Sequence, residues 1–269
     1  MSLIPLHNVT VTGSGERTLL MSHGFGCGQE MFRHLVTAFA DDYRVVRYDL
    51  AGSGAYPAEQ FSRSRYQSLQ GYADDAIAIC EELGLEDVIH IGHSVSAMIA
   101  GLAAAKRPDL FSEVVMICPS ARYINEGEYV GGFSEQDIEE LLEVMGENYV
   151  AWSGQLAPAI MGNAERPQLG EELTTSFCKM DPDIANFFGR VTFTSDNRAD
   201  LKRITTPTLV LQCNEDIISP EPATRYVHEQ LANSQLVSLK ARGHCPNLSA
   251  PKETAQAIRN FLSQASVPA

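Results

Sequence analysis

Short apolar runs separated by amphipathic stretches dominate this chain outside residues 122–201. Five runs rich in leucine and β-branched residues have the length of buried strands and lie at 18–22, 44–49, 88–91, 112–118 and 208–213. Helical patterns lie between several of them, and the one at 69–83 has apolar residues near one face and is followed by Gly84. Strands that alternate with helices form a parallel sheet with helices on both faces. The sequence therefore predicts an α/β fold with a mostly parallel central sheet.

Both ends of the chain extend this pattern. Residues 9–12 and 18–22 flank a Gly-Ser-Gly turn and are expected to pair as a hairpin. After the strand at 208–213 the sequence predicts four elements in turn: a helix at 222–231, a short strand at 235–239, a loop at 240–246 and a last helix at 251–262.

Between residues 122 and 201 the strand pattern stops and the pattern becomes helical. Four helices are predicted there, at 134–146, 149–160, 169–180 and 182–193. The first of them begins with Ser134 and Asp137 at capping-box spacing. We expect this segment to be a cap inserted above the sheet. The predicted domains are then a first core segment at 1–121, a helical cap at 122–201 and a second core segment at 202–269.

The segment VIHIGHSVSAMIAG at 88–101 joins a buried strand to a helix of small residues. A tight strand-to-helix turn exposes its central side chain above the sheet, beside the free N–H groups of the helix N-terminus. Ser94 has that central position, in a sequence close to G-x-S-x-G in which Ser96 replaces the last glycine. Ser94 is therefore predicted to be a nucleophile. The alternative is an ordinary helix start in an α/β protein.

Two further loops at the carboxyl ends of predicted strands carry an acid and a base. Asp216 follows the strand at 208–213, and His244 lies in the loop after the last strand. With Ser94 they follow the chain order Ser, acid, His that hydrolytic enzymes with this elbow use. We predict that Ser94 attacks a carbonyl, that His244 takes and returns its proton, and that Asp216 orients the imidazole.

The glycine-rich stretch HGFGCG at 23–28 follows the strand at 18–22. Glycines let the backbone turn sharply and point an N–H group inward. Together with the helix N-terminus at the elbow, the backbone N–H groups of Phe25 and Val95 are predicted to form an oxyanion hole. The alternative is a glycine-rich turn without a chemical role.

Other acids and histidines fit these roles less well. Asp181 and Asp196 lie in the helical segment and are expected to be caps or solvated charges. Asp49 ends a strand, but it precedes the elbow and breaks the chain order. His23 is expected to brace the oxyanion loop, and His93 is expected to face away from the site.

Composition narrows the range of partners. The 269 residues have a formal net charge of −14, which disfavours nucleic acids and anionic membrane surfaces as partners. We see neither a signal peptide nor an apolar stretch approaching the ~20 residues that span a membrane. The six cysteines lack the spacing of a disulfide framework, and C-x-x-C and H-E-x-x-H are absent. Reduced cysteines, a cytoplasmic location and no metal site are therefore expected.

Eight stretches spread along the chain resemble the α/β-hydrolase superfamily. They are HGFG at 23–26, DDYRVVRYD at 41–49, RYQSLQGYADD at 65–75, GHSVSAMIAG at 92–101, RPDLFSEVVMI at 107–117, YVGGF at 129–133, FTSDNR at 193–198 and RGHCPNLSAP at 242–251. Within the superfamily the chain is similar to the small branch that holds the bacterial stress regulator RsbQ and the plant karrikin and strigolactone receptors. GHSVSAM is like the plant receptors, RGHCP is like the bacterial regulator, and Gly28 replaces the usual aspartate of the family.

This resemblance implies no cofactor and a V-shaped cap of four helices over a deep, mostly apolar pocket. It places Phe25, Phe133, Phe193 and Ile217 along the pocket and Ser94 at its floor. The alternative for these side chains is ordinary core packing. An apolar pocket with one nucleophile suits a small hydrophobic ester or lactone.

Two functions of different classes fit these predictions. The first is a serine hydrolase that acts on a small hydrophobic ester or lactone through an acyl-enzyme. Such a hydrolase could take part in stress signalling, as RsbQ does. The second is a small-molecule receptor with slow hydrolysis that acts through a signalling protein at the cap. A cofactor-free haloperoxidase or a C–C bond hydrolase would use the same triad. The serine at the elbow disfavours dehalogenases and epoxide hydrolases, in which an aspartate is the nucleophile.

Overall fold

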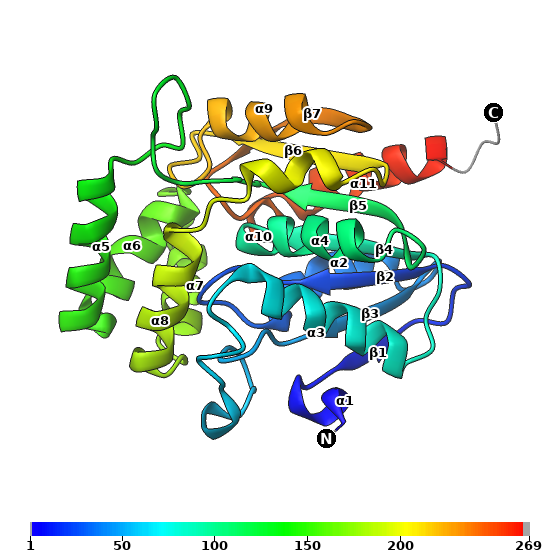
Figure 1. Ribbon diagram of the computed structural model, residues 1–269, viewed down its shortest axis with the longest axis horizontal. Helices are drawn as coiled ribbons and strands as arrows, with labels where there is room; N and C mark the ends of the chain where they lie inside the picture. The colour runs from blue at the N-terminus through cyan, green and yellow to red at the C-terminus, as the bar shows by residue number, and fades with distance from the viewer. Residues whose placement is uncertain (1, 266–269) are drawn as a thin grey trace.

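A seven-stranded sheet with the order β1-β3-β2-β4-β5-β6-β7 forms the centre of the molecule (Figure 1). The structure is a computed structural model and describes residues 2–265. Every neighbouring pair of strands is parallel except β1 and β3. The strands are β1 (Thr10–Thr12), β2 (Thr18–Ser22), β3 (Arg44–Tyr48), β4 (Val88–His93), β5 (Phe111–Ile117), β6 (Thr208–Asn214) and β7 (Ser234–Arg242). This topology confirms the predicted α/β fold with a mostly parallel sheet.

The predicted hairpin between residues 9–12 and 18–22 is wrong. β1 pairs with β3, with Thr10 opposite Arg47, and β3 separates it from β2. A Cβ atom on Gly13 or Gly15 would lie within 2.3 Å of backbone oxygens of the turn before β3. The two glycines therefore let the chain pass in close contact with the turn before β3. In this way the chain leaves β1 on one side of β3 and enters β2 on the other side.

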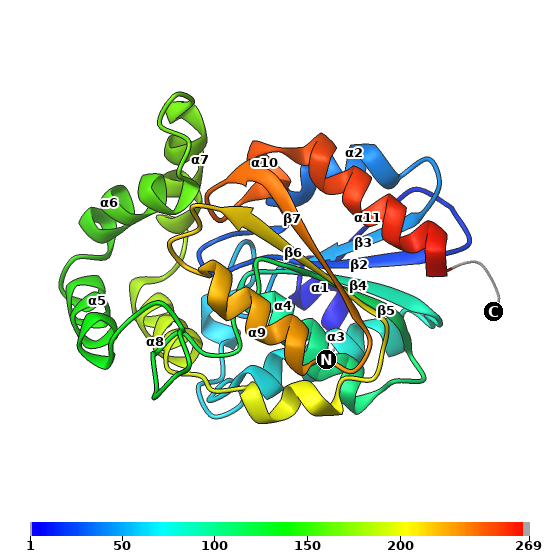
Figure 2. The same cartoon turned by 90° about the horizontal axis from the view of Figure 1, so that it is seen from above.

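Helices cover both faces of the sheet, as Figure 2 shows: α2, α10 and α11 lie on one face, and α3, α4 and α9 lie on the other. The helices of the core are α1 (Leu3–Leu6), α2 (Arg33–Phe39), α3 (Leu69–Glu82), α4 (Val95–Lys106), α9 (Glu221–Gln230), α10 (Pro246–Ser249) and α11 (Pro251–Ala265), with 3-10 turns η1 (Gln29–Phe32), η2 (Ala58–Gln60) and η3 (Arg198–Arg203). The central strands β2 and β4 are buried along their whole length, because both of their faces are covered.

Four helices between β5 and β6 gather at one end of the sheet, on the left of Figure 1. They are α5 (Glu135–Glu147), α6 (Tyr149–Met161), α7 (Pro167–Phe177) and α8 (Pro182–Phe193). Their number and positions agree with the predicted helices, and the Ser134 hydroxyl and the Asp137 carboxylate form the expected capping box. Residues 122–133 are an irregular loop instead of helix. The division into core and cap at residues 122 and 201 stays a prediction.

The edge strand β7 is longer than the short strand predicted at 235–239. Near its end, the backbone N–H groups of Lys240 and Ala241 donate to the carboxylate of Glu253 on α11. A side chain thus satisfies edge groups that a central strand would pair with another strand. The loop that carries His244 is correspondingly shorter than predicted.

Two further observations bear on the sequence predictions. Within the described part of the chain, no helix is both long and apolar enough to cross a membrane. None of the six cysteines, all within the described residues, forms a disulfide, and their reduced state stays a prediction. Five of the six are buried, and Cys178 is exposed.

Candidate active site

Ser94 lies in the turn between β4 and α4 with φ 59° and ψ −126°, a backbone conformation that non-glycine residues seldom adopt. Its N–H donates to the carbonyl of Ile117, which holds the turn against β5. A Cβ atom on Gly92 would lie 2.0 Å from the Ser96 carbonyl oxygen. Glycine is therefore required two residues before the serine, because the helix returns directly over that position.

Ser96, which replaces the last glycine of the common motif, has a partner of its own. Its hydroxyl donates to the carbonyl of His23 at 2.5 Å, at the end of β2. The hydroxyl therefore ties the elbow to the loop at 23–28. His23 in turn accepts a hydrogen bond at Nε2 from the Leu50 N–H, so it braces that loop as expected.

The three predicted catalytic side chains meet. The Nε2 atom of His244 lies 2.7 Å from the Ser94 hydroxyl oxygen. The Nδ1 atom of the same imidazole lies 2.7 Å and 2.9 Å from the two carboxylate oxygens of Asp216. A carboxylate only accepts, so Nδ1 carries the proton and Nε2 is the acceptor for the Ser94 hydroxyl. Ser94, Asp216 and His244 are 7%, 6% and 3% exposed, so bulk water screens these contacts little.

The Asp216 carboxylate is held in its charged form. Burial alone would raise its pKa, but the His244 imidazole and the N–H groups of Ser219 and Ile218 lower the pKa below its ordinary value. These N–H groups donate to one carboxylate oxygen at 3.0 Å and 2.9 Å. Asp216 is therefore ionised at neutral pH and stabilises a positive charge on His244.

The loop that carries His244 is fixed by two other segments. The His244 N–H donates to the carbonyl of Ile160 near the end of α6, and the Gly243 N–H donates to the carbonyl of Asn214 at the end of β6. Gly243 has φ +76°, and a Cβ atom there would lie 2.1 Å from the Met161 carbonyl oxygen. The predicted base is thereby positioned by α6 as well as by the sheet.

His93 does not face away from the site, contrary to the expectation from the sequence. Its Nε2 atom donates to the backbone carbonyl of His244 at 2.7 Å, and the two imidazole rings lie 5.1 Å apart. Burial, together with the neighbouring His244, lowers the pKa of His93 to about 3. His93 is therefore a neutral side chain that supports the base.

The two predicted oxyanion-hole donors lie beside the nucleophile. Val95 is the first residue of α4, where the helix offers an N–H group without an intrahelical acceptor. A Cβ atom on Gly24 would lie 3.1 Å from the Ser94 Cβ, so the loop that carries Phe25 packs directly on the elbow. Within residues 2–265, neither the Phe25 nor the Val95 N–H donates a hydrogen bond. Both are free to receive an oxyanion, and this role stays a prediction.

A cavity borders Ser94 and is enclosed by α6, α7 and α8. It has about 400 Å³ of space free of atoms, part of it open to solvent, but only about 30 Å³ admits the centre of a water molecule. Its wall is formed by Gly24, Phe25, Cys27, His93, Ser94, Tyr123, Ile160, Leu173, Phe177, Thr192, Phe193, Ile218, His244 and Cys245. The enclosed part is narrow and mostly apolar, so it favours a small hydrophobic ligand.

Only two of the four predicted pocket residues line this cavity, namely Phe25 and Phe193. Ile217 is 49% exposed, because the hydrogen bonds from the next two N–H groups to Asp216 turn the chain so that Ile218 faces inward instead. Phe133 lies in a loop whose backbone pairs with Tyr123, and the Tyr123 side chain lines the cavity in its place.

The alternative acids and nucleophiles have other roles. Asp181 caps α8, and Asp196 forms ion pairs with arginines, as expected for caps and surface charges. The Asp49 carboxylate accepts hydrogen bonds from three neighbouring groups and is part of the core. Burial raises the pKa of the Cys27 and Cys245 thiols, which stay protonated at neutral pH and do not compete with Ser94.

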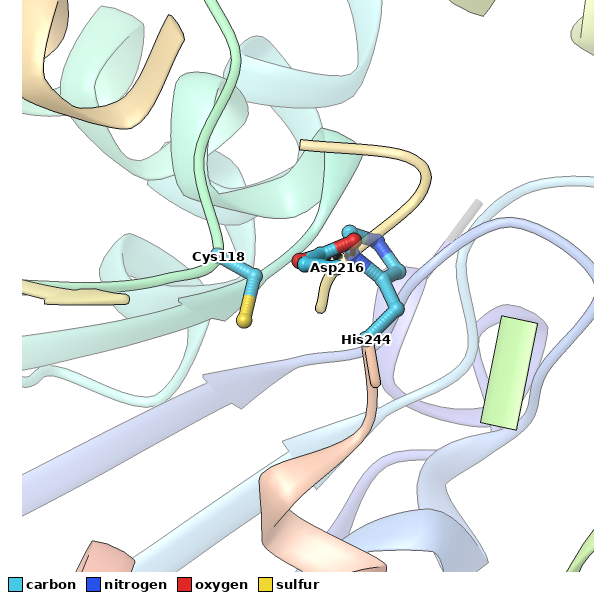
Figure 3. A group of neighbouring side chains, drawn as sticks. All are labelled: Cys118, Asp216 and His244. Atoms are coloured by element: carbon cyan, nitrogen blue, oxygen red, sulfur yellow. Dashed lines mark hydrogen bonds and ion pairs between the residues drawn. The ribbon is translucent and has the colours of Figure 1, made fainter. Parts of the chain in front are cut away.

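Cys118 is a neighbour of the predicted triad that the sequence did not indicate. It follows β5 with φ +53°, and Figure 3 shows its side chain beside Asp216 and His244. Its thiol sulfur, a carboxylate oxygen of Asp216 and a ring nitrogen of His244 all lie within 4.8 Å of one another. The sequence signal that could have indicated this contact is the position of Cys118 directly after β5, because β5 is the neighbour of β6, the strand that Asp216 follows.

The sequence pattern of the alpha/beta hydrolase family matches residues 19–257. Karrikin insensitive 2 receptor IA of Petunia hybrida is 39% identical over 259 residues, which are 96% of this chain and 94% of that protein. A strigolactone esterase of Arabidopsis thaliana is 39% identical over 256 residues, which are 95% of this chain and 96% of the esterase. The chain is thus similar along nearly its whole length to proteins named as receptors and as esterases.

Solved structures agree with these relatives. A hydrolase from Oleispira antarctica has 40% sequence identity and a TM-score of 0.94, with 97% of this chain and 96% of that chain covered. The similarity therefore includes both the sheet and the helices between β5 and β6.

Proposed function

The chain belongs to the alpha/beta hydrolase family, and from this premise we propose that it hydrolyses a small hydrophobic ester or lactone with Ser94, His244 and Asp216 as its catalytic triad. The observation that carries the proposal is the 2.7 Å contact between His244 Nε2 and the Ser94 hydroxyl, with Nδ1 held by Asp216. A serine hydroxyl is a weak nucleophile until such a base takes its proton.

The reaction would proceed in two steps. Ser94 Oγ attacks the substrate carbonyl while its proton moves to His244 Nε2, and the oxyanion that forms is received by the N–H groups of Val95 and Phe25. The imidazolium then protonates the leaving alkoxide, which stays attached to the acyl chain when the substrate is a lactone. Water, activated by the same imidazole, hydrolyses the acyl-enzyme and restores Ser94. Each oxyanion donor contributes about 3–4 kcal/mol in other hydrolases.

The cavity supports a substrate that is small and mainly apolar. Phe25 is part of its wall, and the rings of Phe177, Phe188 and Phe193 lie 5.5–6.2 Å from the Phe25 ring. Thr192 adds one polar group to the wall, and among the described residues its buried hydroxyl has no hydrogen-bond partner. A lactone or ester that carries a further oxygen atom outside its ester group would satisfy this hydroxyl, whereas a ligand that is apolar outside the ester group would leave it unpaired.

Steady-state hydrolysis tests the proposal. We expect turnover of short-chain p-nitrophenyl esters and simple lactones, a fall of several orders of magnitude for Ser94→Ala and His244→Ala, and little change for Ser153→Ala. Ser153 is a suitable control because it is also a buried serine, but its hydroxyl donates to the Tyr149 carbonyl instead of contacting His244. Unchanged turnover in Ser94→Ala would refute the assignment of the nucleophile.

A receptor function is the second candidate, favoured by the full-length similarity to a protein named as a receptor. In that case the triad turns the ligand over slowly, and helices α5–α8 signal occupancy to a protein partner. Single-turnover and steady-state rates with the same lactone separate the two functions. A fast first turnover followed by slow product release, with partner capture that depends on the lactone, supports the receptor. Fast steady-state turnover without a partner supports the enzyme.

A further inference from the structure

A thiol lies beside the hydrogen bond between Asp216 and His244 (Figure 3). Three potential metal ligands, the Cys118 sulfur, an Asp216 oxygen and a His244 nitrogen, lie within 4.8 Å of one another, and all three residues are buried. They come from three separate segments, after β5, after β6 and after β7. The proposed hydrolysis uses Asp216 and His244 but has no step for Cys118.

A second thiol contacts the first. The sulfur of Cys213, near the end of β6, lies 3.6 Å from the Cys118 sulfur. A tetrahedral zinc site with bonds of about 2.0–2.3 Å places its ligand atoms roughly 3.3–3.8 Å apart. The separation of the two sulfurs already fits this geometry. The Cys118 sulfur, the Asp216 oxygen and the His244 nitrogen lie within 4.8 Å of one another and need to approach by about 1 Å to reach it.

We propose that Cys118, Asp216 and His244, with Cys213 as fourth ligand, form a buried inhibitory site for Zn²⁺ or another thiophilic divalent cation. Two sulfurs, one imidazole nitrogen and one carboxylate oxygen are ligands that zinc accepts, whereas magnesium and calcium require oxygen ligands. The cation reaches the group through the catalytic cavity, whose wall includes His244.

Cation binding at this site would inhibit hydrolysis by changing the tautomer of His244. His244 Nδ1 faces Asp216 and is the ring nitrogen available as a ligand, because Nε2 faces Ser94. The cation replaces the proton on Nδ1, this proton is carried by Nε2 instead, and the Cys118 and Cys213 thiols each release one proton to solvent. No electron is transferred. An Nε2 atom that carries a proton cannot accept the proton of Ser94, so the nucleophile is no longer activated.

Cation binding and hydrolysis are measured separately, because the inhibitory effect rests on the proposed triad whereas binding does not. The reduced protein, kept in a phosphine reductant that does not chelate metals, is titrated with Zn²⁺ and Cd²⁺. Native mass spectrometry gives the stoichiometry, the ultraviolet absorption of cadmium thiolate reports the sulfur ligands, and ester hydrolysis is followed in parallel.

We expect one bound cation per chain, a cadmium thiolate absorption, and at least about tenfold loss of hydrolysis that a chelator reverses. Cys118→Ala and Cys118→Ser should bind the cation at least about tenfold more weakly and stay active at the same Zn²⁺ concentration. Cys118 does not line the catalytic cavity, so these variants should hydrolyse the ester normally without metal. Cys213→Ala should weaken binding as well.

Cys178→Ala is the matched control, because Cys178 is the exposed thiol and the first place where a cation would bind non-specifically. It should bind and be inhibited like the parent protein. Equal binding and inhibition in Cys118→Ala, or a cadmium absorption lost in Cys178→Ala, would overturn the proposal. Cation binding that depends on Cys118 in a protein without esterase activity would instead contradict the proposed function and leave the site standing.

Discussion

The imidazole of His93 donates a hydrogen bond from Nε2 to the backbone carbonyl of His244 at 2.7 Å, and both residues are buried. The residue that precedes the proposed nucleophile thus holds the loop of the proposed base. His93, the covalent neighbour of Ser94, and His244, 151 positions later in the sequence, are joined by one hydrogen bond next to the pair that must react.

His93→Leu should lower kcat by about tenfold or more and change KM little. Without the donor, His244 loses a support of its backbone, and misplacement of a reacting group by about 1 Å costs up to about a hundredfold in rate. His93→Gln keeps an N–H donor at a similar distance and should recover most of the rate. Steady-state kinetics of the three proteins test this role, and equal kcat in His93→Leu and the parent would exclude it.

Acidification should destabilise the protein through its buried histidines. Burial lowers the pKa of His90 to about 3, and burial is also the main reason why the pKa of His93 is about 3. The unfolded chain binds a proton at each of these positions below about pH 6.5, whereas the folded protein does not. Each histidine therefore leaves stability unaffected above pH 6.5 and lowers it by about 1.4 kcal/mol per pH unit between pH 6.5 and about 3.

Guanidinium unfolding at pH 7 and pH 5 measures this effect. In His90→Gln the unfolded chain no longer binds a proton at position 90. The glutamine retains a donor for the Ser22 hydroxyl, which His90 Nε2 contacts at 2.7 Å. The loss of unfolding free energy between the two pH values should be about 2 kcal/mol smaller in this variant than in the parent. An identical loss in both proteins would show that His90 is not held neutral.

Two glycine-to-alanine substitutions should have opposite effects. A Cβ on Gly92 would lie 2.0 Å from a backbone oxygen of the elbow, so Gly92→Ala should cost about 1–3 kcal/mol and displace Ser94, with loss of hydrolysis. Gly154, exposed on α6, has no atom within 4 Å of the corresponding position. Gly154→Ala should stabilise the protein by up to about 1 kcal/mol and leave hydrolysis unchanged. Thermal unfolding and ester hydrolysis check both, and an active Gly92→Ala protein would argue against a tight elbow.

Thr192→Val should weaken the binding of a lactone substrate without lowering the stability of the fold. The Thr192 hydroxyl is buried without a partner in the described chain, so its replacement by a methyl group should leave the melting temperature unchanged or slightly raised. If a lactone oxygen pairs with this hydroxyl, KM for the lactone rises, whereas KM for an ester of a plain alkyl acid changes little. A fall in melting temperature of several degrees would mean that the hydroxyl has a structural partner.

Local signals made most of the fold predictable, and with it the meeting of the three residues that we propose as the triad. The capping box at Ser134 marked the start of α5, and the strand, glycine and serine pattern marked the elbow at Ser94. Chain order then selected Asp216 and His244 among several acids and histidines. Each of these inferences depends on residues adjacent in sequence or on strand ends that a parallel sheet brings to one edge.

Contacts between distant segments were beyond such reasoning. The pairing of β1 with β3 depends on a close backbone crossing at Gly13, which no periodicity records. The choice of Ile218 over Ile217 for the cavity depends on a turn made by hydrogen bonds to Asp216. The positions of His93 against His244 and of Cys118 against Asp216 follow from how neighbouring strands end.

The most direct test of the account is covalent labelling by a fluorophosphonate, which reacts only with an activated serine. Peptide mapping after labelling should place one phosphonyl group on Ser94, and the label should be absent in Ser94→Ala and strongly slowed in His244→Ala. Undiminished labelling of Ser94→Ala, or equal labelling rates in His244→Ala and the parent, would contradict the claim that His244 activates Ser94 across their 2.7 Å contact.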